Sequence, residues 1–244
     1  MSNEEEILNS NVAVATIEEK DQIQVQERQY EIIEVKGGKV YAFLKRTMDI
    51  CASFLGIVIL AIPMLIIGLI IKLTSKGPIL FKDKRVGKNG KEIKVYKFRS
   101  MYIDAESNID KYLTPEQKER WLIERKLEND PRITPIGKFT RKTSLDELPQ
   151  LFNIFKGDLS IVGPRPITKK ELEDNYSEFE RKILLSARPG LTGYWQVSGR
   201  SNVDYESRER QKLEIEYFTK RGFWFDIGII FKTIPAVLFH KGAH

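Results

Sequence analysis

The sequence predicts a mainly helical α+β protein with a re-entrant membrane helix, a small β-hairpin and amphipathic helices at the membrane interface. Three observations point to this class. Residues 50–71 form an uncharged apolar run that is long enough to enter a bilayer. Residues 78–98 alternate between apolar and polar side chains around an Asn-Gly turn, which is typical of a hairpin. Helix-forming segments make up most of the remaining chain, and the last, at residues 205–240, is amphipathic and aromatic.

The first part of the chain differs in charge from the remainder. Residues 1–36 carry nine acidic and three basic side chains, whereas the following 208 residues carry 37 basic and 25 acidic ones. Because residues 1–28 are polar and show little periodicity, we predict a disordered acidic tail there. Residues 29–244 are then expected to form a single membrane-associated domain, which starts with a short strand at residues 29–35.

The apolar run lies within a helix that we predict over residues 41–74. Basic residues flank the run on both sides, namely Lys45, Arg46, Lys72 and Lys76. The positive-inside tendency would hold both flanks on the cytoplasmic face, which a straight spanning helix cannot do. Pro63 removes a helical hydrogen bond and favours a bend near the midpoint. These features predict a re-entrant helix–break–helix that enters one leaflet and returns. A spanning helix with basic residues on both sides remains the alternative.

The segments that follow carry clear start and stop signals. The hairpin predicted over residues 78–98 has its turn at residues 88–91. A helix is expected over residues 114–128, because Thr-Pro at its start supplies a cap and a favourable first residue. Further helices are predicted from about residue 144 and over residues 169–186.

The last part of the chain combines a loop with two helices. Residues 188–201 are rich in glycine and are expected to form a loop. Residues 205–220 have the charged, amphipathic pattern of a surface helix. Residues 223–239 are apolar and aromatic but contain Asp, Lys and Pro, so they suit an element at the lipid head groups better than a span. A buried core helix remains the alternative for this segment.

Composition excludes several kinds of chemistry. Cys51 is the only cysteine, so the chain can form neither an intrachain disulfide nor a CxxC metal site. The only histidines are His240 and His244, so any catalysis would rely on carboxylates, lysines, arginines or hydroxyls. The basic charge after the tail suits anionic membrane lipids and phosphate-bearing substrates. Nucleic acid is not predicted as a partner, because the sequence carries no nucleic-acid-binding signature.

Adjacent carboxylates at Asp146 and Glu147 are the strongest chemical signal in the sequence. They are predicted at the N-terminus of a helix, where the helix dipole favours ionised carboxylates. The tetrapeptide Ser-Leu-Asp-Glu also matches a capping box, in which Ser144 and Glu147 would cap the helix. This structural role is the alternative when the motif is viewed alone.

Several basic residues and two prolines lie in short motifs before and after these acids in the sequence. The candidate substrate-binding residues are Lys97, Arg99, Arg141, Arg165, Pro164 and Pro166. Ionised carboxylates close to several cations suit a Mg²⁺–diphosphate site, in which the acids hold the metal or attack phosphorus and the bases bind phosphate oxygens. We therefore expect Mg²⁺ as a cofactor, with Asp146 and Glu147 as its ligands. For each basic residue taken alone, a solvated surface role remains the alternative.

Short motifs that are weak individually occur here in an order that is specific. They are YKFRSM at the end of the hairpin, DPRIT, LDELPQL, KGDLSIVGPRP and PGLTGYWQVSGR. From the membrane segment to the C-terminus the sequence resembles the monotopic phosphoglycosyl transferases, bacterial sugar transferases of the undecaprenyl-phosphate glucose or galactose phosphotransferase type. The resemblance implies their fold, with a catalytic domain on the cytoplasmic face of the bacterial inner membrane. It maps the family's acidic pair onto Asp146 and Glu147, and its basic residues onto Lys97, Arg141 and Arg165.

The resemblance also implies a reaction. Members transfer a sugar 1-phosphate from a UDP-sugar to undecaprenyl phosphate, giving undecaprenyl-diphosphate-sugar and UMP, the first membrane step of exopolysaccharide, capsule or glycoconjugate synthesis. Asp146 would attack the β-phosphorus and form a covalent aspartyl phosphosugar, while Mg²⁺ held partly by Glu147 would stabilise the leaving UMP. Glucose or galactose is the expected sugar, because LTGYWQVSGR resembles hexose-using relatives.

Some features separate this chain from its relatives or leave alternatives open. Relatives often carry Ser-Pro at the helix break, whereas this chain has Ile62-Pro63 and lacks a hydroxyl to bond the freed backbone. The chain resembles the short form of the family, without a multi-helix N-terminal module. The absence of G-x-G-x-x-G, Walker A and D-x-D motifs argues against other nucleotide sites. A membrane-associated diphosphate hydrolase and a non-enzymatic, acidic-lipid-binding scaffold are the alternative functions, and a homodimer is left open.

Overall fold

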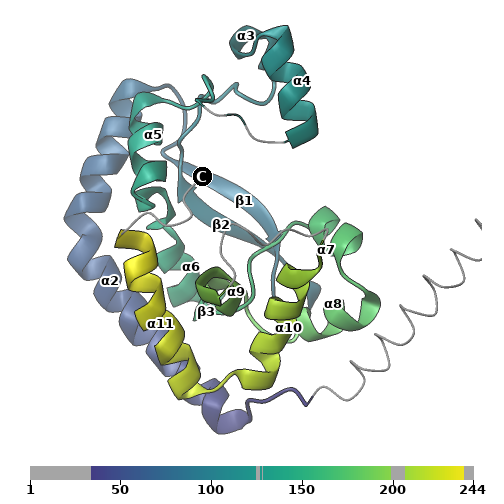
Figure 1. The fold of residues 1–244 in the computed structure, drawn as a ribbon. Helices are drawn as coiled ribbons and strands as arrows, with labels where there is room; N and C mark the ends of the chain where they lie inside the picture. Colours follow the sequence, from purple (N-terminus) through teal and green to yellow (C-terminus); the bar gives the residue numbers. More distant parts are fainter. Residues whose placement is uncertain (1–33, 125–126, 128, 199–206, 239–244) are drawn as a thin grey trace, which may run out of the picture.

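The computed structural model describes residues 34–124, 127, 129–198 and 207–238. Within these residues the protein is mainly helical and contains two small sheets, so the predicted α+β class is confirmed. The predicted acidic tail at residues 1–28 lies outside the described residues. Figure 1 shows a central hairpin with one long helix along one side of the molecule and shorter helices around it.

Helix α2, Lys39–Thr74, is the longest described element and continues without interruption through Pro63. The expected break at this proline is therefore absent, although the helix curves along the side of the molecule (Figure 1). A proline removes one hydrogen bond and bends a helix, but the neighbouring turns keep theirs. Residues 34–38 precede α2 without regular structure, so the described end of the strand predicted at residues 29–35 is not a strand.

Strands β1, Leu80–Val86, and β2, Glu92–Phe98, form the predicted hairpin and pair antiparallel along their whole length. The turn η1, Lys88–Gly90, places Asn89 at φ 58° and Gly90 at φ 76°. These are the left-handed conformations that Asn-Gly turns supply at low steric cost. The hairpin prediction is confirmed.

A second sheet joins two segments that are far apart in the sequence. Strand β3, Ser160–Val162, pairs in parallel with β4, Gly190–Thr192. Glycine is required here because the backbones approach closely: a Cβ atom on Gly190 would lie 2.2 Å from a backbone nitrogen of the segment after β3. The prediction of a loop over residues 188–201 is therefore wrong, since β4 and helix α9, Tyr194–Ser198, occupy most of it.

Helices α3, Ile109–Tyr112, and α4, Pro115–Glu124, lie together beyond one end of the hairpin (Figure 1). Thr114 caps α4: its hydroxyl accepts a hydrogen bond from the Gln117 amide at 3.3 Å, and its own amide donates to the Gln117 side chain at 3.1 Å. The predicted start of this helix is confirmed. Its described part ends at Glu124, before the predicted end at residue 128.

Helix α5, Pro135–Lys142, is followed by the 3₁₀ turn η2, Leu145–Glu147, and by helix α6, Gln150–Lys156. The helix predicted from about residue 144 thus begins later than expected. Pro149 immediately precedes α6, as is favourable for a residue without an amide hydrogen at a helix start. The residues before it are left to form a tight turn.

The single helix predicted over residues 169–186 is in fact two helices, α7, Lys169–Asn175, and α8, Glu178–Leu185. Each begins with a capping box, formed by Thr168 with Glu171 and by Ser177 with Glu180. The second capping box lies inside the segment predicted as one helix. A Ser-x-x-Glu signal within a helical pattern therefore marked a break between two helices.

Helices α10, Glu209–Lys220, and α11, Phe223–Leu238, complete the described fold. In α11, Ile229 is buried, whereas Trp224 is 80% exposed and Phe231 is 68% exposed. The helix therefore packs on the core with one face and presents large apolar side chains on the other. This pattern favours the predicted interfacial element over a helix buried on all sides.

Three apolar clusters among the described residues hold the helices and strands together. The largest joins α7, α8, α10 and α11 and includes the fully buried Phe218. The second joins α2 to the hairpin through Phe98, and the third joins β2 to α6 through Val95 and Ile154. Because β2 contributes to two clusters, it fixes the position of α2 relative to α6.

Both ends of α2 are anchored to the same folded body. Near the N-terminal end, Lys45 pairs with the buried Asp226 of α11 at 2.5 Å, and Arg46 donates to two carbonyl oxygens at the end of α6 at 2.7 and 2.8 Å. At the C-terminal end, Arg99 donates to the carbonyl oxygen of Ser75 at 2.9 Å. Two of the basic residues that predict the orientation of this helix are thus engaged by the protein itself.

We expect Gly190→Ala to destabilise the protein, because the new methyl group would overlap the backbone that faces β4. Overpacking of this kind costs about 1–3 kcal/mol of unfolding free energy. Thermal unfolding in detergent measures the change. Gly228→Ala in α11 is the matched control, since its Cβ position has nothing within 4 Å apart from the neighbouring residues of its own helix, and it should be at least as stable as the wild type. Equal unfolding temperatures for the two variants would contradict the close approach of β3 and β4.

Candidate active site

Asp146 and Glu147 lie in the turn η2, between α5 and α6. Ser144, immediately before the turn, has φ 57°, a left-handed conformation that few serines adopt, and its side chain caps no amide. The alternative capping-box role for Ser144 and Glu147 is therefore wrong. The Glu147 amide instead donates to the Ser144 carbonyl oxygen at 3.3 Å. A strained residue beside two carboxylates is a feature that clusters at functional sites.

The end of strand β2 brings Lys97 to the acidic pair. Its ammonium nitrogen lies 2.9 Å from Oε1 of Glu147, and both side chains are partly exposed. Water screens such a pair, so it adds little to stability. The positive charge of Lys97 also lowers the pKa of Asp146, which places one cation beside both carboxylates.

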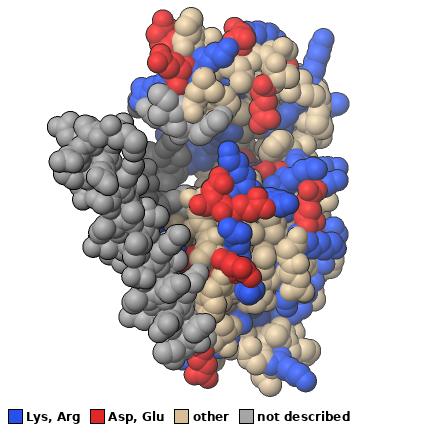
Figure 2. Space-filling view, turned by 90° about the vertical axis from the view of Figure 1, so that its right-hand side faces the viewer, with Lys and Arg blue, Asp and Glu red and all other residues tan. Residues whose placement is uncertain are grey.

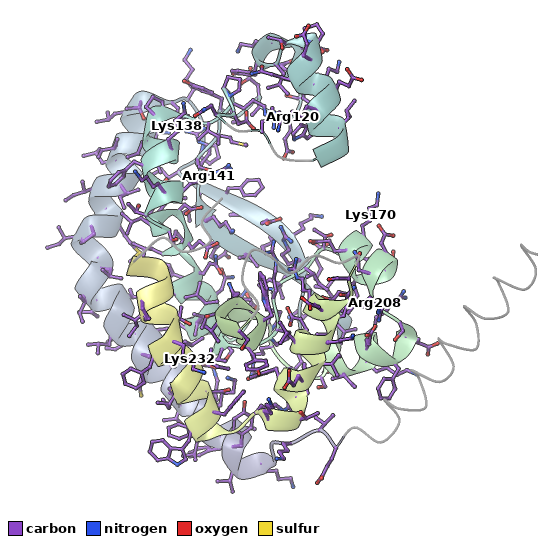
Figure 3. All side chains as sticks on the ribbon, viewed as in Figure 1. Arg120, Lys138, Arg141, Lys170, Arg208 and Lys232 are labelled. Carbon is purple, nitrogen blue, oxygen red and sulfur yellow. The ribbon has the colours of Figure 1, made fainter. Side chains whose placement is uncertain are left out.

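The last turn of α5 supplies Arg141, which lies between α5 and the hairpin in Figure 3. Its Nε donates to the hydroxyl oxygen of Ser100 at 2.8 Å. Ser100 is buried and follows β2 closely in the chain. It was not among the predicted site residues, because a serine gives no sequence signal until the fold brings it to an arginine 41 residues away.

The pKa of Asp146 is raised to about 6, mainly by burial and also by the neighbouring charge of Glu147. The positive charges of Lys97 and Arg141 act in the opposite direction. A carboxylate with this pKa is largely ionised at neutral pH and is more basic than an exposed aspartate. Asp146 therefore has the properties of a carboxylate nucleophile.

Arg99 was predicted to bind substrate, but its contacts lie at the end of the membrane helix. Its Nη1 donates to the carbonyl oxygen of Lys76, and its Nη2 donates to the carbonyl oxygen and hydroxyl of Ser75 at 2.9 and 2.7 Å. The side chain is buried there. These bonds satisfy carbonyl groups that the end of α2 leaves open. The structure thus groups Arg99 with α2, and a role toward substrate stays a prediction.

Arg165 and its two flanking prolines lie after β3 and belong to a different group of residues. The Arg165 amide donates to both carboxylate oxygens of Glu214, at 3.2 and 3.3 Å. Its guanidinium carbon lies 5.6 Å from the centre of the Trp195 ring. The carbonyl oxygens of Pro164 and Pro166 accept hydrogen bonds from the Gly190 amide and the Arg85 side chain. The predicted substrate contacts of these three residues stay predictions.

A buried ion pair near the site was not predicted from the sequence. Arg132 donates to both oxygens of Asp130, at distances from 2.7 to 3.1 Å, and its own amide donates to the same carboxylate at 2.9 Å. The guanidinium also lies 4.8 Å from the centre of the Trp121 ring. The Asp-x-Arg spacing in DPRIT is visible in the sequence, but the burial that would make the loss of either partner costly is not.

The donor atoms of the site fit a magnesium ion that also binds substrate. No group of three or more His, Cys, Asp or Glu side chains able to hold a metal occurs among the described residues. Mg²⁺ commonly uses only one or two protein carboxylates and completes its shell with phosphate oxygens and water. Asp146 and Glu147 supply that number, so they suit a metal that arrives with a diphosphate.

The fold and the site define a class of protein. Helix α2 is long and apolar enough to cross a membrane, and only 22% of its most apolar stretch is buried, unlike a core helix of a soluble protein. Beside it lies a carboxylate pair with flanking cations, an arrangement suited to phosphate-bearing substrates. These are the features of a membrane-associated protein whose carboxylate pair and cations suit phosphate-bearing ligands. It belongs to the bacterial sugar transferase family, whose sequence model matches residues 40–240, and the resemblance stated from the motifs is confirmed.

Three relatives show how far the similarity extends. The chain is 47% identical over 205 residues to the undecaprenyl-phosphate galactose phosphotransferase of Salmonella typhimurium. The aligned region covers 83% of this chain and 42% of that protein. It is 36% identical over 209 residues to the UDP-glucose:undecaprenyl-phosphate glucose-1-phosphate transferase of Escherichia coli, covering 84% and 42%. It is 39% identical over 204 residues to the exopolysaccharide production protein ExoY of Rhizobium meliloti, covering 82% and 88%. The chain thus spans less than half of the first two proteins and most of the third.

The raised pKa of Asp146 determines the sign of a stability effect. Between the ordinary value of 3.8 and the folded value of about 6, the folded protein binds more protons than the unfolded chain, so stability due to this group falls as the pH rises. Asp146→Asn cannot ionise, so it removes the loss of stability that comes with the ionisation of this buried carboxyl group. Its unfolding temperature should exceed that of the wild type by more at pH values near 7.5 than near 4.5.

Thermal unfolding of the two proteins at both pH values measures this difference. In a Lys97→Met background, the difference in unfolding temperature between proteins with and without Asp146→Asn should be larger near pH 7.5. The reason is that the cation that favours the ionised carboxylate is removed. A gap that stays constant or shrinks as the pH rises would show that Asp146 is not held in a destabilising environment.

Proposed function

We propose that the protein transfers a sugar 1-phosphate from a UDP-sugar to undecaprenyl phosphate, giving undecaprenyl-diphosphate-sugar and UMP. The observation that carries this proposal is the environment of Asp146, a partly buried carboxylate with a raised pKa that lies beside Glu147 and two cations. The names of the relatives describe phosphotransferases that act on undecaprenyl phosphate. Glucose or galactose is the proposed sugar, and exopolysaccharide, capsule or glycoconjugate synthesis is the proposed pathway.

The proposed reaction has two displacement steps at the same phosphorus. First, an oxygen of Asp146 attacks the β-phosphorus of the UDP-sugar, and the bond from that phosphorus to the bridging oxygen breaks. UMP leaves with the bridging oxygen, and the sugar phosphate remains on Asp146 as an acyl phosphate. Second, a phosphate oxygen of undecaprenyl phosphate attacks this phosphorus and releases the Asp146 carboxylate. The two steps return the enzyme to its starting state.

The other residues of the site offset charge. Lys97 and Arg141 lie where they act electrostatically on Asp146, so they can also bind the oxygens of an approaching diphosphate. The Arg141 Nε donates to the hydroxyl oxygen of Ser100, and this bond limits the directions in which the guanidinium can point. Glu147 and Asp146 would hold Mg²⁺. The metal would supply neutralisation of the diphosphate charge.

The placement of α2 supports a monotopic position in the membrane. Its outer face presents large apolar side chains that are more than half exposed, namely Phe54, Leu55, Val58, Ile59, Ile62, Leu65, Ile66 and Leu69. Figure 2 views the molecule from the side away from α2 and shows a surface rich in charged side chains. Because both ends of α2 contact the same body, a helix that crossed the bilayer would pull charged parts of that body into the hydrocarbon.

We therefore propose that α2 enters one leaflet of the bacterial inner membrane and that the body lies at its cytoplasmic face. The exposed aromatic side chains of α11 would sit among the head groups, and the basic residues would attract anionic lipids. This position brings a soluble nucleotide sugar and a lipid phosphate to the same plane. A homodimer stays a prediction.

Wild-type protein incubated with UDP-glucose or UDP-galactose in the absence of lipid should become heavier by one phosphohexose. The added mass should map to the peptide that contains Asp146, because the carboxylate has no acceptor to which it can pass the group. Intact-protein mass spectrometry after rapid quenching detects the adduct. Asp146→Asn should form none, and Glu147→Gln should be impaired chiefly in its response to Mg²⁺.

The same preparations separate the alternative functions. UMP release that requires undecaprenyl phosphate supports the transferase. Release at the same rate without lipid identifies a hydrolase, and no release with any UDP-sugar identifies a scaffold. If no adduct forms while Asp146→Asn still turns over, the covalent mechanism is wrong and direct displacement replaces it.

Cysteines placed at Val40 and Lys76 test the membrane position, because both residues are exposed and lie near opposite ends of α2. In a Cys51→Ser background, neither cysteine should react with a membrane-impermeant thiol reagent added outside intact cells. Both should react once the cells are permeabilised, which serves as the control. Labelling of only one site in intact cells would establish a spanning helix.

A further inference from the structure

Lys97 carries a flexible side chain on a main chain that is fixed from both sides. It lies opposite Phe81 in the hairpin, and the Tyr96 amide before it donates to Oδ1 of Asn153 on α6 at 2.8 Å. Phe98 after it is buried against α2. The lysine side chain itself is 31% exposed and ends in an ammonium on a flexible stem. The ammonium can therefore change position while β2 stays in place.

The ammonium of Lys97 occupies one oxygen of a candidate metal ligand. Its nitrogen lies 2.9 Å from Oε1 of Glu147. Among the described residues, no other side chain donates a hydrogen bond to this carboxylate. Of the cations that lower the pKa of Asp146, Lys97 also acts more strongly than Arg141. One lysine thus offsets negative charge on both members of the acidic pair.

The second cation of the site is held differently. The Nε of Arg141 donates to the hydroxyl oxygen of the buried Ser100 at 2.8 Å, so its partner is a neutral group. Within the described part of the chain, Arg141 forms no salt bridge with either acid, whereas Lys97 is bonded directly to one of them. Of these two cations, Lys97 is therefore the one that has to leave a carboxylate before a metal can bind there.

A divalent cation on Glu147 would lie close to this ammonium. Mg²⁺ binds carboxylate oxygens at about 2.1 Å, so even on the second oxygen it would face a positive charge across one carboxylate group. Like charges at such short range repel each other. The ion pair itself is partly exposed, so water screens it and separating the two side chains costs little. Lys97 is thus bound weakly enough to leave Glu147, yet it opposes a metal while it stays there.

We propose that Lys97 competes with a divalent cation for Glu147, so that the site binds the cation firmly only when an anionic ligand draws the ammonium away. This role rests on the proposed function, because the diphosphate of the UDP-sugar is that anionic ligand. Loss of Lys97 then tightens the binding of the cation alone. It also reduces the factor by which the cation and the diphosphate strengthen each other's binding. A change that merely damaged the fold would weaken the binding of both ligands.

Binding of the cation alone is measured with Mn²⁺, which takes the same oxygen ligands as Mg²⁺ and gives a paramagnetic resonance signal when free in solution. The full-length protein is titrated in an uncharged detergent without nucleotide, so that neither lipid head groups nor turnover contribute. Lys97→Met should bind Mn²⁺ about tenfold more tightly than the wild type, because one opposing charge is removed. Lys97→Gln, which also removes the charge, provides a second variant if the first fails to fold.

The coupling between the two ligands is measured by calorimetry with UDP, in the presence of Mg²⁺ and in the presence of EDTA. Because such coupling is reciprocal, the improvement in UDP affinity that Mg²⁺ causes also reports the effect of UDP on the metal. This improvement should be smaller in Lys97→Met than in the wild type. An equal improvement in the two proteins would show that Lys97 does not link the ligands, and the proposal would be wrong.

Lys156→Met is the matched control. Lys156 also lies 2.9 Å from a carboxylate, that of Asp158, but this pair is at the opposite end of α6 from the acidic pair. The control should leave the affinity for Mn²⁺ unchanged. Equal gains from Lys156→Met and Lys97→Met would show a general effect of net charge and would overturn the competition. The absence of a gain in both Lys97→Met and Lys97→Gln would overturn it as well.

Lipid-dependent UMP release from UDP-glucose or UDP-galactose is measured on the same wild-type preparation. If release occurs but Lys97→Met gains no affinity for Mn²⁺, the proposed function stands and the role of Lys97 fails. If no release occurs with either UDP-hexose, the proposed function fails, and with it the diphosphate as the ligand that displaces Lys97.

Discussion

The structure depends on how a long apolar helix is tied to a charged body. Helix α2 has 36 residues, and the residues that anchor it are polar: Lys45 reaches the buried Asp226, and Arg99 holds the carbonyl groups beyond Thr74. Asp226 also accepts hydrogen bonds from the hydroxyls of Tyr41 and Tyr217. Each of these buried groups would be costly without its partners, so the contacts leave the helix little freedom to pivot away from the body. The anchoring of α2 also fixes the acidic pair, because β2, which ends beside that pair, packs against both α2 and α6.

The acidic pair shows how a fold can tune ordinary side chains. Two adjacent carboxylates in solution would both ionise with little consequence. In η2, burial and mutual repulsion raise the pKa of Asp146, while Lys97 and Arg141 keep it within reach of ionisation at neutral pH. Ser144 has a positive φ, which costs backbone energy, so some stability is lost at the turn that holds the acidic pair.

The local elements could be predicted where one segment carried the whole signal, and the family could be predicted from the order of several weak motifs. The Asn-Gly turn predicted the hairpin, and Thr-Pro predicted the start of α4, because both depend on interactions within a few residues. The division between α7 and α8 was not predicted, although its capping box is visible in the sequence, because apolar residues keep a helical spacing on both sides of it. The short parallel sheet could not be predicted, because glycines that read as loop in the sequence are there for close contact between distant backbones.

The sequence by itself determined the apolar helix, the hairpin, the acidic pair and the order of motifs that identify the family. The first three depend on residue type and on spacing along one segment, and the last depends on the order of short segments along the chain. Only the tertiary structure decided which cations belong together: Lys97 and Arg141 join Asp146, Arg99 joins the end of α2, and Arg165 joins Glu214. Charge and burial act through space, so a lysine 49 residues away can matter more to a carboxylate than a cation much closer along the chain.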